Sequence, residues 1–138
     1  DLAGVLTSLL ERLRNTTDSH LHAQLSTEAA RRLSGHQSVH LANLAREALS
    51  NAIRHAHADR IRVTLKEDRD HVTLEILDDG IGFDPVQPIH NGLGLESMAA
   101  RARGAGGELQ IESSADAGTR IKVTVPAPSS PSRNPNLS

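Results

Sequence analysis

The 138-residue chain has no cysteine, tryptophan or tyrosine, and Phe83 is its single aromatic residue. Without cysteine there can be no disulfide bond and no thiolate metal site, which fits a reducing compartment. A core built without aromatic residues must consist of leucine, isoleucine, valine and alanine. For the same reason, stacking of a base on aromatic side chains is not expected as the mode of ligand recognition.

Long apolar runs and an excess of positive charge are also missing. No run is long enough to cross a bilayer and no signal-peptide pattern is present, so a cytoplasmic location is expected. The net charge of -2 argues against direct binding of nucleic acid, because phosphate backbones usually require a basic surface. The chain begins at Asp1 and not at Met, so we interpret it as a piece of a longer protein, with any membrane anchor upstream.

What remains predicts one globular domain and a tail. The hydrophobic content of 37% and charged content of 23% are ordinary for a globular protein, and 138 residues suffice for one core. Four of the six prolines fall between Pro126 and Ser138, in a segment rich in Pro, Ser and Asn. We therefore expect a domain over residues 1–126 and a disordered tail over residues 127–138.

Apolar residues spaced three and four apart predict three amphipathic helices. These are expected over about residues 2–13, 39–57 and 95–104. Residues 35–38 are expected to form a loop that ends in a helix N-cap at Ser38.

Apolar and polar residues alternate in the segments between the helices, which predicts strands with one buried and one wet face. A weak alternation covers residues 20–26, and clear ones cover residues 60–66, 71–76, 108–112 and 120–125. The expected fold is an α/β protein of the α+β type. It is a two-layer sandwich in which about three helices cover one face of a mixed, mostly antiparallel sheet of five strands.

Four polar residues flank the apolar face of the second predicted helix. Glu47, Asn51, Arg54 and His55 fall within an arc of roughly 100°. Asn51 offers a neutral oxygen to Mg²⁺, Glu47 could act as a base or polarise an attacking group, and cationic side chains could meet phosphate oxygens. The same residues would also suit a solvated helix flank, so the helix alone leaves both interpretations open.

The motif Asp-x-Gly-x-Gly at residues 78–82 follows the third predicted strand. Parity places Asp78 on the inward face with Ile76, and an inward carboxylate needs a partner because an unpaired buried charge is costly. The amino group and ring nitrogen of adenine are one such partner. Gly80 and Gly82 would let the backbone turn sharply and keep side chains away from a flat base. A carboxylate that merely caps the turn explains the motif about equally well.

Thr119 stands just before the last strand and shares its parity with Ile121, so its hydroxyl is also expected to face inward. If the last strand is a neighbour of the strand that leads to Asp78, Thr119 could help Asp78 to hold the base, directly or through water. Otherwise Gly118 and Thr119 simply form the exit of a hairpin.

A glycine-rich segment leads into the third predicted helix. It consists of Gly92, Leu93, Gly94 and Leu95. Such an entry offers free backbone N–H groups and a positive dipole end to phosphates, although an ordinary loop-to-helix hinge would look the same. Seven of the ten glycines lie between Gly80 and Gly107, which suits close approach of the backbone to a ligand.

In this order the motifs resemble the N, G1 and G2 boxes of the GHKL (Bergerat-fold) ATPases. More closely, they are similar to the catalytic and ATP-binding domain of bacterial two-component sensor histidine kinases. Residues 46–56 and 92–101, followed by Gly106 and Gly107, are especially similar to the nitrate-sensor-like subfamily. The resemblance covers residues 1 to about 126.

The resemblance implies a protein histidine kinase domain that uses ATP and Mg²⁺ and transfers the γ-phosphate to a histidine on a dimerisation domain. Its further partner would be a cognate response regulator. Glu47 and Asn51 are implied as catalytic residues, with Asn51 on Mg²⁺ and Asp78 on the adenine amine. The implied ATP site consists of Asn51, Arg54, His55, Asp78, Gly80, Gly82, Gly92, Leu93, Gly94, Leu95 and Thr119.

Two departures from the family pattern are visible. The phenylalanine-containing box of many sensor kinases is missing between Phe83 and Gly92. None of the eight histidines is followed by an acidic residue and preceded by basic ones, as a phosphoacceptor would be. We therefore expect the acceptor domain upstream of Asp1, a monomeric fragment and a homodimeric full-length protein.

Other functions of the same fold remain as alternatives. An anti-sigma-factor serine kinase would resemble this chain through Gly82, but residues 98–107 look more like a sensor kinase. A regulatory module could bind nucleotide without catalysis, although the presence of both Glu47 and Asn51 argues against a degenerate site. DNA-topology and chaperone ATPases would normally need a longer chain.

Overall fold

The computed structural model describes residues 1–84 and 94–128. Along the chain the elements are α1 (Leu2–Arg14), β1 (His20–Leu25), α2 (Thr27–Arg32), α3 (Gly35–Arg54), β2 (Arg60–Glu67), β3 (His71–Asp78), α4 (Leu95–Gly104), β4 (Glu108–Ser113) and β5 (Thr119–Pro126). Within these described residues, no helix combines the length and the apolar character that crossing a membrane would need.

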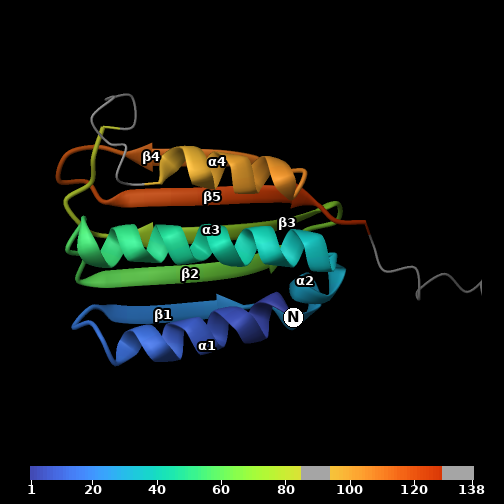
Figure 1. Ribbon diagram of the computed structural model, residues 1–138, viewed down its shortest axis with the longest axis horizontal. Coiled ribbons are helices and arrows are strands. Elements are labelled where there is room, and N and C mark those ends of the chain that lie inside the picture. The colour runs from blue at the N-terminus through green and yellow to red at the C-terminus, as the bar shows by residue number, and fades with distance from the viewer. Residues whose placement is uncertain (85–93, 129–138) are drawn as a thin grey trace, which may run out of the picture.

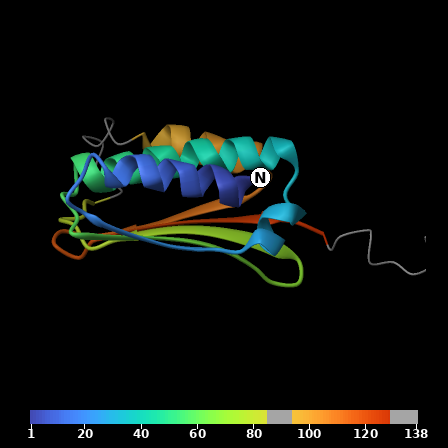
Figure 2. The ribbon, with the colours of Figure 1, turned by 90° about the horizontal axis from the view of Figure 1, so that it is seen from below.

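The five strands form one sheet in the order β1-β2-β3-β5-β4 (Figure 1). β1 runs parallel to β2, and the other three neighbouring pairs are antiparallel. Seen from the side, the long helices α1, α3 and α4 lie on one face of the sheet, and no described helix covers the other face (Figure 2). α3 packs between α1 and α4, so it runs over the middle of the sheet. The expected mixed, two-layer architecture is confirmed.

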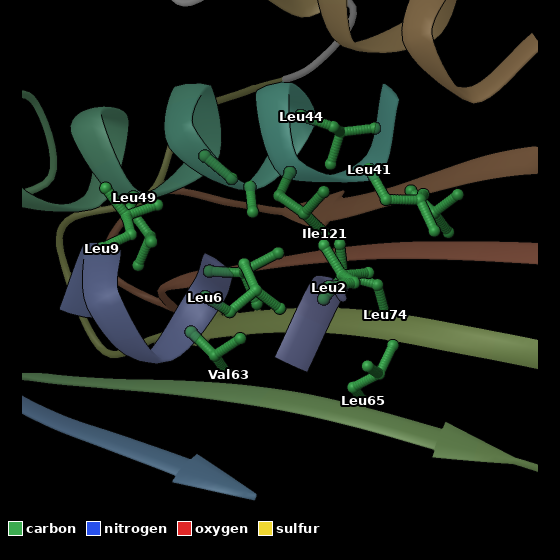
Figure 3. Packing of buried hydrophobic residues seen from close by; sticks show 14 of the residues in the cluster. Leu2, Leu6, Leu9, Leu41, Leu44, Leu49, Val63, Leu65, Leu74 and Ile121 are labelled. Atoms are coloured by element: carbon green, nitrogen blue, oxygen red, sulfur yellow. The ribbon is translucent and has the colours of Figure 1, made fainter. Parts of the chain in front are cut away.

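Aliphatic side chains fill the space between the two layers. Figure 3 shows leucines of α1 and α3 meeting aliphatic residues of the sheet, among them Leu6, Leu49 and Val63. The five inward residues expected from strand parity are all at most 4% exposed: Val63, Leu74, Ile76, Ile121 and Val123. Burial of each such side chain stabilises the fold by roughly 1.5–3 kcal/mol. The aliphatic residues therefore form a stable core without aromatic side chains.

Two details of the helix layer differ from the sequence-based expectation. The short helix α2 was not predicted, because six residues are too few to establish a period; Ser26 caps it by accepting from the Ala29 N–H. The long helix α3 begins at Gly35, and its N-cap is Ser34 instead of Ser38. Ser34 forms a capping box with Gln37, in which each side chain accepts from the other residue's backbone N–H.

The packed domain extends beyond the expected boundary at Pro126. Ala127 is completely buried, its N–H donates to the carbonyl of Asp70 at 3.0 Å, and its own carbonyl accepts from Arg32. The boundary was placed too early because a single alanine among prolines carries no periodic signal. Residues 129–138 lie outside the described part of the chain.

Candidate functional site

A cavity of about 190 Å³ opens between α3 and the ends of β3 and β5. Its walls are formed by Ala48, Asn51, His55, Ala56, Ile76, Asp78, Ile81, Gly82, Phe83, Leu95, Thr119 and Ile121. Six predicted site residues from distant parts of the sequence thus meet around one space: Asn51, His55, Asp78, Gly82, Leu95 and Thr119. Most of the wall is apolar and the polar groups are few, which is typical of a small-molecule site.

Asp78 and Thr119 are the two polar residues that the sheet contributes to the cavity wall. They are directly opposite each other in the antiparallel pair of β3 and β5, and they are 8% and 7% exposed. The parity argument is therefore confirmed for both residues, and the strands are neighbours as the base-binding hypothesis requires. Burial raises the pKa of the Asp78 carboxyl, and the hydrogen bond that the Gly80 N–H donates to it at 2.8 Å opposes this only in part.

Asn51 and His55 bring the end of α3 to the cavity. Asn51 lies within the last turn of the helix and is half-buried, and His55 is the C-cap residue. Arg54, between them in the predicted polar arc, is exposed and does not line the cavity. Of the three predicted ligand-binding residues at this end of α3, two therefore face the cavity directly.

Glu47 lies one turn before Asn51, in a neighbouring hollow between α3 and α4. Its carboxyl group lies against Gly94, where an added Cβ would come within 2.8 Å of the Glu47 Cδ atom. Gly94 also has a φ of +68° and is the N-cap of α4. The positive φ favours glycine, so this predicted motif position has a structural cause. Gly92 and Leu93 lie outside the described residues, whereas Leu95 lines the cavity.

The two glycines after Asp78 serve the packing of the protein itself. A Cβ on Gly80 would lie 2.5 Å from the Cβ of Ala56, and Gly80 does not line the cavity. Gly82 lines the cavity with a φ of +68°, and an added Cβ would collide with the carbonyl of Ser114. Contacts with Ala56, just after α3, and with the β4–β5 turn thus already require glycine at both positions, and their role in clearing a ligand stays a prediction.

Phe83 bears on the expectation that stacking on aromatic side chains plays no part in ligand recognition. The single aromatic residue of the chain is part of the cavity wall, beside Ile81 and Gly82. Composition could not exclude an aromatic contact with a ligand, because one ring in the right place is sufficient. Ala48, Ala56 and Ile81 are further wall residues that carried no chemical signal in the sequence.

The donors near the cavity suit a hydrated cation better than a protein-caged one. Among residues 1–84 and 94–128, no cluster of three or more His, Cys, Asp or Glu side chains could hold a metal ion. Mg²⁺ keeps several waters and uses one or two protein oxygens together with substrate phosphates. The amide oxygen of Asn51, with the Glu47 carboxylate one turn away, is compatible with that requirement.

Comparison with known proteins places the chain in a family. Residues 36–129 match the family described as histidine kinase-, DNA gyrase B-, and HSP90-like ATPase. The chain belongs to this family. The matched residues of this ATPase domain include the whole of the cavity wall.

Relatives of this ATPase domain occur among sensor proteins. Sensor protein VraS of Staphylococcus haemolyticus is 37% identical over 87 residues, which are 63% of this chain and 25% of that protein. VraS of Staphylococcus aureus (strain COL) gives the same identity over the same length. The chain thus spans about a quarter of the length of the curated relatives it matches.

Solved structures show the same fold. A mycobacterial sensor histidine kinase, MprB, has a TM-score of 0.69 at 23% identity, covering 93% of this chain and 95% of the other. The blue-light activated histidine kinase of Erythrobacter litoralis EL346 has a TM-score of 0.73 at 20% identity, covering 90% of this chain and 40% of that one. The five-stranded sheet with helices on one face is therefore the architecture of histidine kinase ATPase domains.

Proposed function

We propose that this chain is the ATP-binding catalytic domain of a two-component sensor histidine kinase. The observation that carries the proposal is the pairing of Asp78 with Thr119 in the sheet wall of a mostly apolar cavity, whose helix wall contains Asn51. A carboxylate held on the inward face at the end of a strand, in the wall of a mostly apolar cavity, suits the amino edge of adenine. Membership of the ATPase family and the sensor relatives support the same reading.

Each wall of the cavity has a role in this proposal. Asp78 accepts a hydrogen bond from the adenine amine, and the aliphatic wall at Ile76 and Ile121 excludes water from the base. Asn51 would hold Mg²⁺, which when bound balances the charge of the phosphates. His55, with Arg54 just outside the cavity, is placed to meet phosphate oxygens.

Glu47 is assigned to the reacting end of the nucleotide. Its carboxylate lies between α3 and the N-terminus of α4, next to Gly94. The backbone N–H groups at that helix end attract phosphate, and the carboxylate beside them can orient or polarise the attacking group. We therefore propose Glu47 and Asn51 as the catalytic pair.

The phosphoryl acceptor is proposed to be a histidine of a separate dimerisation domain. Phosphoryl transfer requires a nucleophile in line with the γ-phosphate, and none of the eight histidines of this chain has the sequence setting of an acceptor. The phosphohistidine would then transfer its phosphoryl group to an aspartate of a response regulator. The whole sensor is proposed to act as a homodimer, whereas this domain is proposed to be monomeric.

Two measurements on the purified domain test this function. Calorimetric titration should detect binding of ATP that is stronger with Mg²⁺ than without it. Incubation with γ-labelled ATP should leave the domain itself unlabelled, and adding a dimerisation domain should produce an acid-labile phosphohistidine on that added domain. Stable label on this chain would contradict the proposal, and label on a serine of a partner would favour the serine kinase instead.

A further inference from the structure

Ser113, the last residue of β4, joins three parts of the site through one hydroxyl group. Its Oγ accepts from the backbone N–H of Phe83 at 2.8 Å and donates to the carbonyl of Gly118 at 3.0 Å. It also lies 2.8 Å from the Oγ1 of Thr119, its direct partner in the β4–β5 register. Ser113 thus connects the cavity wall at Phe83 with the hydroxyl that lies opposite Asp78.

Only one placement of the hydrogens makes all three of these hydrogen bonds at once. A serine hydroxyl has one hydrogen and two lone pairs. The Phe83 N–H can only donate and the Gly118 carbonyl can only accept, so the hydrogen of Ser113 is used on Gly118. The contact with Thr119 is then a hydrogen bond that Thr119 donates. With its single hydrogen committed to Ser113, the Thr119 oxygen can only accept from a ligand.

The direction of the hydrogen bond between Thr119 and Ser113 determines which bases the cavity can bind. Building on the proposed nucleotide function, we propose that Ser113 is a positioning residue that turns Thr119 into a pure acceptor beside the Asp78 carboxylate. The edge of the cavity then presents two acceptors and no side-chain donor from this pair. A base whose edge carries an amino group satisfies both, whereas a carbonyl at the same place would face two lone-pair-bearing groups. Ser113 therefore selects amino-bearing purines against oxo-purines.

Inosine triphosphate is the matched probe, because it carries a carbonyl where ATP carries the amino group. The quantity to measure is the ratio of the dissociation constants for the two nucleotides, with Mg²⁺ present. The unchanged domain should prefer ATP. Ser113→Ala frees the Thr119 hydrogen to turn toward a carbonyl, so it should lower the preference by roughly three- to tenfold. Ser113→Thr keeps the hydroxyl and should retain the preference.

Ser114→Ala is the control, since it removes the same hydroxyl from an exposed neighbour outside this network. It should leave the ratio of dissociation constants unchanged. The thermal midpoint of each variant shows whether it is folded. If Ser113→Ala is folded and weakens both nucleotides by the same factor, Ser113 is only structural and the proposal is wrong.

Thr119→Val provides a second test that does not depend on the folding of Ser113→Ala. If Thr119 is an acceptor, loss of its hydroxyl weakens binding of ATP more than binding of inosine triphosphate, and the preference for ATP falls. If Thr119 instead donates into the cavity, its loss weakens inosine triphosphate more and the preference rises, which overturns the proposal, as does an unchanged ratio. In the double variant, Ser113→Ala should have no further effect on the ratio. Failure of the unchanged domain to bind either nucleotide would overturn the proposed function as well.

Discussion

Asp78 is a buried carboxyl group in the cavity wall, so its placement affects both the stability of the fold and the proposed ligand binding. Burial raises its carboxyl pKa above the usual value, so the folded state holds this proton more tightly than the unfolded state does. Its contribution to stability is therefore fully present below the unfolded pKa and is lost as the pH rises through the folded pKa. At neutral pH a buried carboxylate destabilises the empty domain, which is the pattern expected of a binding group.

The variant Asp78→Asn separates the effect of the buried charge on stability from its effect on ATP binding. The amide still accepts from the Gly80 N–H but carries no charge, so the free energy of unfolding of the empty domain at pH 7 should stay equal or rise. ATP binding should weaken by about 1.5–3 kcal/mol, the size of a hydrogen bond to a charged group. Urea denaturation and calorimetric titration measure the two quantities.

Asp79→Asn is the matched control for that substitution. Asp79 is exposed, and its Oδ1 atom accepts from the backbone N–H groups of Asp59 and Arg60, away from the cavity. Its replacement should leave ATP affinity unchanged. Equal losses in the two variants would show that Asp78 does not contact the base.

A separate prediction at the residue scale concerns Asn51. Asn51→Ala removes the proposed oxygen ligand of Mg²⁺, so it should weaken binding of ATP with Mg²⁺ more than binding of ATP with chelator. Titrations under the two conditions give the comparison, and Asn43→Ala, two turns earlier on α3, is the control. An equal loss with and without metal would assign Asn51 a structural role.

At the scale of elements, the two ends of α3 have different tasks. Its C-terminal end brings Asn51 and His55 to the cavity, and its N-terminal end is held by the capping box of Ser34 and Gln37. Sequence pattern favoured Ser38 as the cap because the apolar stripe begins at residue 39. The structure adds a turn before that stripe, which the reciprocal hydrogen bonds of the box stabilise.

Substitution of the two serines tests where the helix begins. Ser34→Ala should lower the free energy of unfolding by about 1 kcal/mol, because it leaves helix N–H groups without an acceptor. Ser38 lies inside α3, so Ser38→Ala should lower the free energy of unfolding by less than half as much. Urea denaturation of both variants decides between the two caps; a larger loss at Ser38 would place the start of α3 where the sequence pattern did.

At the scale of the whole molecule, Arg32 connects segments from three parts of the chain. Its guanidinium group bonds to the Glu67 carboxylate at 3.0 Å, to carbonyls of the β2–β3 turn, and to the carbonyl of Ala127. The side chain is only 11% exposed, so these bonds are shielded from water. One side chain of α2 thus holds the turn and the end of the last strand together.

Arg32→Lys should therefore destabilise the domain although it preserves the charge. An ammonium group cannot reach several acceptors in the fork geometry of a guanidinium group, and about 2 kcal/mol of unfolding free energy should be lost. Arg31→Lys, an exposed neighbour, should cost almost nothing. Thermal and urea unfolding compare the pair, and ATP affinity should change in neither, because α2 does not contribute to the cavity wall.

The features that follow from local periodicity could be predicted from the sequence alone. Alternation fixes which side of a strand each residue faces, so the inward positions of Asp78, Thr119 and the aliphatic core were predicted correctly. Helical spacing likewise placed α1, most of α3 and α4. The order of the polar motifs was sufficient to indicate the ATPase family.

Only the tertiary structure decided which of these residues meet. Strand parity is set by the local backbone, whereas the neighbour of a strand depends on the order of the whole sheet. The pairing of β3 with β5 and of β5 with β4 brings Asp78, Thr119 and Ser113 together. Packing of α4 beside α3 in the helix layer likewise puts Glu47 against Gly94, and Phe83, held by Ser113 of β4, joins the cavity wall. No local pattern encodes these contacts, because each depends on segments that approach one another only when the sheet and its helices are assembled.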